Sequence, residues 1–177
     1  MVKDVHGVTV ECVKGDITAQ EGFDAVVNAA NAQLKPGGGV AGALHNAAGE
    51  ALEKACEPLA PIEPTEAVVT DAFNLPNDYV IHSLGPVYGV NKPEDILLRK
   101  AYERILKKAE EKGVESLALP ALSTGAFNYP MEEAADVAIK AIHDMASNLS
   151  HVTRIRFVLY DDAALRVHEH ACERIIG

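Results

Sequence analysis

The sequence alternates short apolar segments with amphipathic stretches, and this order restricts the available folds more than any other feature. Apolar runs of strand length are separated by segments whose apolar residues recur at helical spacing. Such an alternation indicates an α/β fold with a mainly parallel sheet covered by helices on both faces. The expected strands are 8–13, 25–28, 67–70, 79–82, 117–119 and 154–160, the last exposed on one side.

The expected helices carry signals at their ends. They span about 40–48 and 94–112, with a third opened by Pro130 and a last one ending near Ile175. Gly113 suits the C-terminal cap of the second helix, because glycine readily adopts the left-handed conformation found there. Acidic residues follow Pro130 in the first turn of the third helix, where the helix dipole favours negative charge.

Length and composition predict one domain over residues 1–177. A chain of 177 residues is near the usual size of a single domain and can bury a core without disulfides or metals. Apolar residues make up 48% and charged residues 24%, which is ordinary globular composition. No repeat, low-complexity tract or linker divides the chain.

The charge balance narrows the class of partner. The chain has 16 Lys and Arg against 26 Asp and Glu, a net charge of −10. This argues against duplex DNA or an anionic membrane, because both favour clustered cations. A small anion remains open as a ligand, since backbone N–H groups at a helix N-terminus can bind one without a basic side chain.

The cysteines and the N-terminus bear on the compartment. Cys12, Cys56 and Cys172 are odd in number and far apart, as expected in a reducing compartment. No apolar run approaches the roughly 20 residues that cross a bilayer, and the N-terminus lacks a signal-peptide pattern. We therefore expect a soluble, cytoplasmic protein, and a monomer.

Ligands of parallel sheets bind beyond the carboxyl ends of the strands, so segments that follow strands are the candidates for chemistry. The first is 15–18. The carboxylate of Asp16 could accept a hydrogen bond from an exocyclic amino group while a neighbouring backbone N–H serves a ring nitrogen, a pairing that accepts adenine and penalises guanine. The alternative is that Asp16 or Thr18 is a turn residue or a helix N-cap.

The second candidate runs from 26–31 to 37–42. Asn28 and Asn31 leave a buried strand, where they can fix backbone turns or point amides at hydroxyl groups. Three glycines at 37–39 then enter a helix, which lets the backbone approach a pyrophosphate closely. The glycines also match the nicotinamide-dinucleotide fingerprint, but that motif should begin directly after the strand. A nicotinamide-dependent oxidoreductase is therefore a remote alternative.

Two further segments follow later strands. In 119–127, small residues ending in Phe127 suggest a second phosphate-holding loop with the aromatic ring against a sugar. The alternative is an ordinary loop whose Phe127 inserts into the core. In 158–161, Tyr160 at a strand end could stack on a base, or could simply pack.

Together with 80–86, these segments resemble the macro domain family, in the family's order and over nearly the whole chain. The resemblance implies a three-layer α/β/α sandwich with a central mixed, mainly parallel sheet and an ADP-ribose site. It implies that Asp16 and Ile17 hold adenine beside Tyr160, that the two loops clasp the diphosphate, and that Phe127 contacts the distal ribose. The residues so implied are Asp16, Ile17, Ala29, Asn31, Gly37, Gly38, Gly39, Val40, Ser123, Thr124, Gly125, Ala126, Phe127 and Tyr160.

The family includes hydrolases and non-catalytic readers of ADP-ribose marks. Its bacterial and human mono-ADP-ribosyl hydrolases usually carry an aspartate where this chain has Ala41. The stretch 34–44 is similar to coronaviral macro domains, which hydrolyse the same linkage without it, although their preceding histidine is Pro36 here. The resemblance thus implies a hydrolase acting on mono-ADP-ribosylated protein, related esters or ADP-ribose-1″-phosphate. Asn31 is its catalytic candidate, orienting the distal ribose. A reader is the alternative.

No metal, cofactor or covalent nucleophile is expected. His168 and His170 are two residues apart and diverge on a helix, so they make a poor metal pair. His82 reads as a satisfied core histidine and His45 as a surface residue. Ser123 lacks a nucleophile-elbow motif. The expected partners are ADP-ribose and mono-ADP-ribosylated protein, with no DNA and no membrane.

Overall fold

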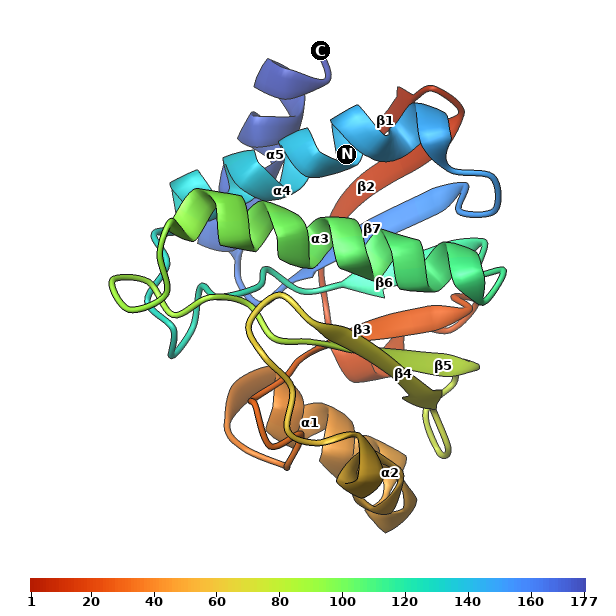
Figure 1. Ribbon diagram of the computed structural model, residues 1–177. Helices are drawn as coiled ribbons and strands as arrows, with labels where there is room; N and C mark the ends of the chain where they lie inside the picture. Colours follow the sequence, from red (N-terminus) through yellow and green to blue (C-terminus); the bar gives the residue numbers. More distant parts are fainter.

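A seven-stranded sheet forms the middle layer of the protein in the computed structural model, which describes residues 1–177 (Figure 1). The strands are β1 (Val2–Val5), β2 (Val8–Lys14), β3 (Ala25–Ala29), β4 (Ala67–Asp71), β5 (Tyr79–Ser83), β6 (Ser116–Leu119) and β7 (Arg154–Leu159). Their order across the sheet is β1-β2-β7-β6-β3-β5-β4. The five inner strands are parallel, and β1 and β4 at the edges are antiparallel. The predicted mixed, mainly parallel sheet is confirmed.

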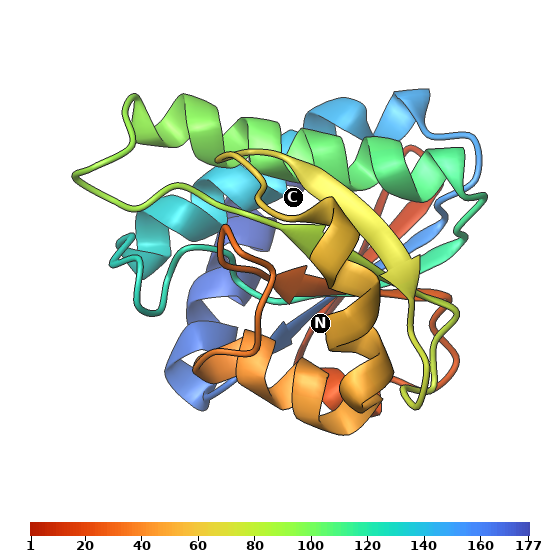
Figure 2. The same cartoon turned by 60° about the horizontal axis from the view of Figure 1, so that its bottom comes forward.

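Helices cover both faces of the sheet. They are α1 (Gly39–Ala48), α2 (Glu50–Cys56), α3 (Glu94–Glu111), α4 (Met131–Met145) and α5 (Asp162–Ile175), with short 3-10 turns η1 (Ile17–Ala19), η2 (Glu57–Leu59) and η3 (Ala146–Asn148). Helices α3, α4 and α5 lie on one face, and α1 and α2 lie on the other (Figures 1 and 2). The predicted three-layer sandwich is confirmed. No helix has both the length and the apolar character needed to cross a membrane.

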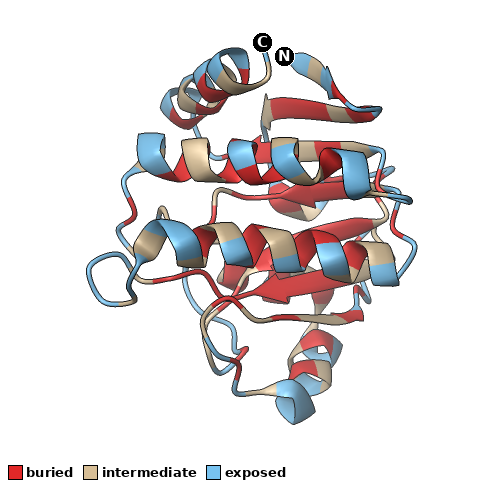
Figure 3. Ribbon diagram, turned by 45° about the horizontal axis from the view of Figure 1, so that its top comes forward, coloured by how far each residue is buried: buried red, intermediate tan, exposed pale blue.

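Each face of the sheet has its own apolar core. Successive residues of β3 alternate between them, since Ala25 and Val27 join the cluster under α3–α5 and Val26 joins the cluster under α1 and α2. The buried residues therefore lie along the strands and on the inner faces of the helices (Figure 3). Burial on both faces explains why β3 reads as a short, nearly continuous apolar run.

Two elements were not expected from the sequence. Strand β1 pairs with β2 through a hairpin turned by His6 and Gly7, which have φ angles of 48° and 85°. Positive φ at both central residues is typical of the tight turns that suit the twist of paired strands. Helix α2 begins directly after Gly49, whose φ of 92° breaks the chain away from α1.

Helices α3 and α4 each have one end within a residue of the predicted position. Gly113, with φ 68°, follows the end of α3 and is left-handed as predicted. Pro130 is the N-cap of α4 rather than its first helical residue, because its ψ of 128° is extended.

The prediction that the strand at 154–160 is exposed on one side is correct only for the first half of β7. Arg154 and Arg156 are half-buried there, on the α1–α2 side of the sheet, where both guanidinium groups lie over the ring of Phe23. Further along, Val158 is buried in the core beneath α1. The strand is inside the sheet, between β2 and β6, so its second half is enclosed on both sides.

A buried polar network ties three strands together under α1. His82 on β5 lies with Nδ1 3.0 Å from Asn28 Nδ2 on β3 and Nε2 2.9 Å from Thr70 Oγ1 on β4. His82 is thus the satisfied core histidine that was expected. His45 is not on the surface as expected: it is buried in α1, with its ring 6.4 Å from that of His82. Burial lowers the pKa of both, that of His82 to about 3.

This burial makes stability pH-dependent. Since His82 has a lower pKa in the folded state than its unfolded value near 6.5, the unfolded chain binds more protons below that pH. The free energy of unfolding should be insensitive to His82 above pH 7 and should fall by up to roughly 1.4 kcal/mol per pH unit from 6.5 towards 3. Urea denaturation at several pH values, compared with His82→Gln, measures this contribution.

The comparison isolates one histidine, because the remaining titrating groups are common to both proteins. His82→Gln should be less stable at pH 7.5 and should lose stability less steeply between pH 6.5 and 5. Equal slopes in the two proteins would contradict the prediction.

Candidate functional site

The carboxyl ends of the parallel strands all point the same way, to the left in Figure 1. We call this side of the sheet its carboxyl edge, as distinct from the edge strands β1 and β4. The segments that follow β2, β3, β5, β6 and β7 all leave from this edge, including the four that the sequence singled out. Ligand sites of open parallel sheets form at such an edge. The topology therefore brings together segments that are far apart in the sequence.

Asp16 and Tyr160 lie just beyond the ends of the paired strands β2 and β7. Gly15 N donates to Leu159 O at 3.1 Å, which places the residues that follow each strand side by side. The ring of Tyr160 is 91% exposed, so it is not simply packed. A large aromatic side chain left uncovered at a strand end is available to stack on a planar ligand.

Asp16 has a structural role in the fold. Its Oδ1 accepts hydrogen bonds from Thr18 N at 2.9 Å and from Thr18 Oγ1 at 2.7 Å, which makes it the N-cap of η1. The Thr18 hydroxyl, followed by its backbone N–H, holds the pKa of the Asp16 carboxyl below its usual range. The side chain of Ile17 is buried beneath α1, so its backbone is the part that can serve a ligand.

The two asparagines have different surroundings. Asn28 is buried against His82 and does not reach the edge. Asn31 is half-buried at the edge, where its Nδ2 donates to Lys35 O at 2.8 Å and its Oδ1 accepts from Lys35 N at 3.0 Å. Asn31 therefore closes the turn that leads into the glycines. An amide has two N–H groups and two acceptor sites on oxygen, so one of each remains for a ligand.

The glycine segment makes a close backbone contact with α1. Gly37, Gly38 and Gly39 are exposed, and Gly39 begins α1 with φ 58°. A Cβ on Gly42 would lie 2.1 Å from the carbonyl oxygen of Gly37, so only glycine fits there. The glycine turn is thereby held against the start of the helix.

The N-terminus of α1 is left free by the protein. No side chain caps it and its first turn holds no acidic residue, whereas each of the other four α-helices has an acidic residue in its first turn. The first N–H groups of a helix have no intrahelical partner and favour an anion. This end of α1 is suited to a negatively charged group.

The loop after β6 leaves from the same end of the sheet as the glycine turn after β3. Phe127 from the loop and Val40 from α1 both pack against the apolar cluster under α1 and α2. Phe127 is half-buried, so it lies at the margin of the core rather than inside it. Gly125 and Ala126 are exposed, while the hydroxyl of Thr124 donates to Ala121 O at 2.9 Å.

The position of the Ser123 side chain depends on a close contact with Gly85 that the sequence did not reveal. It is a buried residue with φ 66°, and its Oγ has no partner within the protein. A Cβ on Gly85, which follows β5, would lie 2.3 Å from that oxygen. The segment 80–86 contributed to the family resemblance, but nothing local in it indicates that Gly85 makes room for Ser123.

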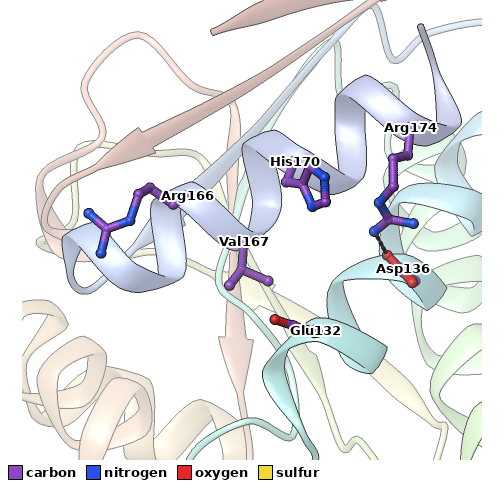
Figure 4. Close-up of a pocket in the computed structure, with 6 residues that line it drawn as sticks. All are labelled: Glu132, Asp136, Arg166, Val167, His170 and Arg174. Carbon is purple, nitrogen blue, oxygen red and sulfur yellow. Dashed lines mark hydrogen bonds and ion pairs between the residues drawn. The ribbon is translucent and has the colours of Figure 1, made fainter.

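A hollow on the surface lies between α4 and α5, outside the segments that follow the strands (Figure 4). Its volume is about 550 Å³, and it is lined by Glu132, Asp136, Arg166, Val167, His170 and Arg174. Arg174 and Asp136 pair across it. Its lining comes from the faces of two helices, carries charges of both signs and includes none of the residues that the sequence analysis predicted for the site. We therefore place the candidate site at the strand edge.

Comparison with known proteins gives consistent matches. The family described as Macro domain matches residues 27–138. A macro domain-containing protein of Cupriavidus necator is 41% identical over 169 residues, covering 93% of this chain and 97% of that protein. A protein of Escherichia fergusonii named O-acetyl-ADP-ribose deacetylase is 42% identical over 164 residues, covering 90% and 92%.

Solved structures agree with the sequence matches. The Oceanobacillus iheyensis macrodomain with ADP superposes with a TM-score of 0.94 at 32% identity, covering 99% of this chain and 96% of that chain. The Trypanosoma brucei macrodomain in complex with ADP-ribose has a TM-score of 0.85 at 30% identity, covering 91% and 68%.

The close contact at Gly42 yields a test of the glycine turn. Gly42→Ala should lower the free energy of unfolding by roughly 1–2 kcal/mol, because the clash with the Gly37 carbonyl outweighs the gain of about 1 kcal/mol in helix propensity. Gly38→Ala is the matched control, since its Cβ would meet nothing within 4 Å. Urea denaturation measures both. A Gly42→Ala protein as stable as the wild type would contradict the prediction.

Proposed function

This chain belongs to the macro domain family, and we propose that it binds ADP-ribose at the carboxyl edge of its sheet and hydrolyses mono-ADP-ribosyl groups on proteins or related ADP-ribose esters. The observation that carries the proposal is the uncapped N-terminus of α1, which is preceded by exposed glycines and lies at the same end of the sheet as the loop after β6. A relative named as a deacetylase of O-acetyl-ADP-ribose and neighbours solved with ADP or ADP-ribose support it.

The adenine end of the proposed site lies between β2 and β7. The carboxylate of Asp16 accepts the exocyclic amino group, the backbone at Ile17 serves a ring nitrogen, and Tyr160 stacks beside the ring. The exposure of Tyr160 and the adjacency of Gly15 and Leu159 support this placement.

The diphosphate lies between the two loops in this proposal. Main-chain N–H groups at the start of α1 and in the loop after β6 receive it, so no basic side chain is needed in a protein of net charge −10. Asn31 and Phe127 contact the distal ribose. The residues that line the phosphate and ribose parts are Ala29, Asn31, Gly37, Gly38, Gly39, Val40, Ser123, Thr124, Gly125, Ala126 and Phe127.

For hydrolysis, we propose positioning rather than side-chain acid–base chemistry. Ala41 is a buried residue of the first turn of α1 and supplies no carboxylate to activate water. Asn31 orients the distal ribose, and a substrate phosphate polarises the attacking water, so the barrier falls because the reacting groups are held in place. The missing carboxylate also favours the second candidate function, a reader that binds ADP-ribosylated partners without turnover.

The adenine assignment is tested by Asp16→Asn. Asparagine can still cap η1 through its oxygen, but its amide N–H groups face the adenine amino group instead of accepting from it. Affinity for ADP-ribose should fall roughly 10- to 150-fold, the loss of one charge-assisted hydrogen bond. Isothermal titration calorimetry measures the affinity. Asp16→Ala, which loses both roles, is the comparison, and unchanged affinity in both variants would leave Asp16 as a cap only.

The catalytic proposal is tested by release of ADP-ribose from a mono-ADP-ribosylated protein. Wild type should release it, and Asn31→Ala should be about 100-fold slower, because a misplaced ribose loses the positioned geometry. If wild type leaves all of the ADP-ribose attached to the substrate protein, this chain is a reader. Full turnover by Asn31→Ala would remove Asn31 from the mechanism.

Two further titrations complete this experiment. Asn31 also closes the turn to Lys35. The ADP-ribose affinity of Asn31→Ala therefore shows whether turnover is lost with binding or separately from it. Titration of wild type with NAD and AMP beside ADP-ribose tests the oxidoreductase alternative, which comparable or tighter NAD binding would favour.

A further inference from the structure

Exposed apolar side chains lie in the loop that follows β5 and at the start of α3. Tyr88, Val90 and Ile96 are 38%, 72% and 53% exposed, and they are three of the seven large apolar side chains that the protein leaves exposed. Tyr88 and Val90 lie in the loop, and Ile96 lies in the first turns of α3. We call these three residues the apolar rim. Neither core of the protein includes them.

The apolar rim is fixed to the loop that carries Phe127. Tyr88 N donates to Phe127 O at 2.8 Å, and the ring of Tyr88 meets that of Tyr129 edge-on at 5.0 Å. Both views show the two loops side by side, at the left of Figures 1 and 2. The apolar rim therefore borders the end of the site where we place the distal ribose.

The loop holds its shape without a partner. Val87 N donates to Asn91 Oδ1 at 2.8 Å, Asn91 N donates to Val87 O at 2.9 Å, and Gly89 N donates to Glu94 Oε2 at 3.2 Å. A preformed loop that presents apolar side chains loses little entropy when it binds. These hydrogen bonds hold the turn in which Val90 is exposed.

Acidic groups flank the apolar rim. Burial, followed by the carboxylates of Asp95, Glu133 and Glu94, raises the pKa of Tyr129 to about 12. The exposed Lys92 is the cation of the loop, so acidic groups outnumber basic ones around Tyr129. An apolar surface bordered by carboxylates is complementary to a polypeptide that carries an apolar side chain beside Lys or Arg.

We propose that the apolar rim docks the polypeptide of the ADP-ribosylated partner, through an apolar residue with Lys or Arg near the modified position. This inference rests on the proposed function, because the polypeptide is attached at the distal ribose. With adenine at Tyr160 and the distal ribose at Phe127, the attached chain leaves the site over Tyr88. The apolar rim then selects among modified proteins by the sequence around the mark.

The test compares ligands that share ADP-ribose and differ in the attached peptide. Two ADP-ribosyl peptides joined by a non-hydrolysable bond are used, one with Leu and Lys beside the mark and one with Ser and Glu, together with free ADP-ribose. Wild type should bind the Leu–Lys peptide at least about 10-fold more tightly than free ADP-ribose. The Ser–Glu peptide should show no such gain.

The matched variants alter only exposed positions. Val90→Ser with Ile96→Ser should abolish the gain for the Leu–Lys peptide and leave affinity for free ADP-ribose unchanged. Asp95→Asn with Glu133→Gln should reduce that gain and its dependence on salt. Val2→Ser, at an apolar residue 63% exposed on β1, is the control and should change nothing.

Each outcome decides one proposal. Equal affinity of wild type for both peptides and free ADP-ribose, or a full gain in Val90→Ser with Ile96→Ser, overturns the docking role but leaves ADP-ribose binding intact. Absence of any ADP-ribose binding by wild type overturns the proposed function and this inference with it. Self-association in sedimentation velocity that disappears in the same double variant assigns the apolar rim to a second copy of the chain and also overturns the inference.

Discussion

The parallel pairing of β2, β7, β6, β3 and β5 is the constraint on which the rest of the molecule depends. Because these strands run in one direction, every segment that follows them begins at the same edge. The pairing of β2 with β7, extended by the hydrogen bond from Gly15 N to Leu159 O, brings the segments that hold Asp16 and Tyr160 side by side. The candidate site therefore needs no dedicated scaffold of its own. Its parts are positioned by the sheet, which is packed on both faces.

The same constraint explains how much of the fold could be predicted. Strands buried on both faces must be apolar throughout, so β3 and β5 were visible as short apolar runs between amphipathic helices. Strand β1 was not, because its Val-Lys-Asp-Val sequence is exposed at an edge and gains its structure from the turn at His6 and Gly7. Helix α2 was missed as well, because a helix of seven residues is too short to show a clear helical repeat of apolar residues.

The close backbone approach in the candidate site could be predicted from the sequence, but the surroundings of several side chains could not. Glycines at a strand-to-helix junction indicate close approach by themselves, and Gly42 does accommodate the carbonyl of Gly37. Contacts between distant segments leave no such local signal, as the fit of Gly85 against Ser123 shows. His45 was placed wrongly for a related reason. Its helix packs over His82, so a residue that looks solvent-facing in sequence is enclosed by tertiary structure.

The distribution of acidic residues follows from helix geometry and separates the two ends of the proposed site. Glu94, Asp95 and Glu133 lie in the first turns of α3 and α4, where the helix dipole stabilises them. Those same carboxylates flank the apolar rim, at the end where a polypeptide would leave. Helix α1 has no acidic residue in its first turn, so its dipole and N–H groups stay uncompensated for a diphosphate. At physiological salt, screening limits the range over which exposed charges interact to about 8 Å. A ligand at either end of the proposed site is therefore affected more by the charges near that end than by the net charge of the protein.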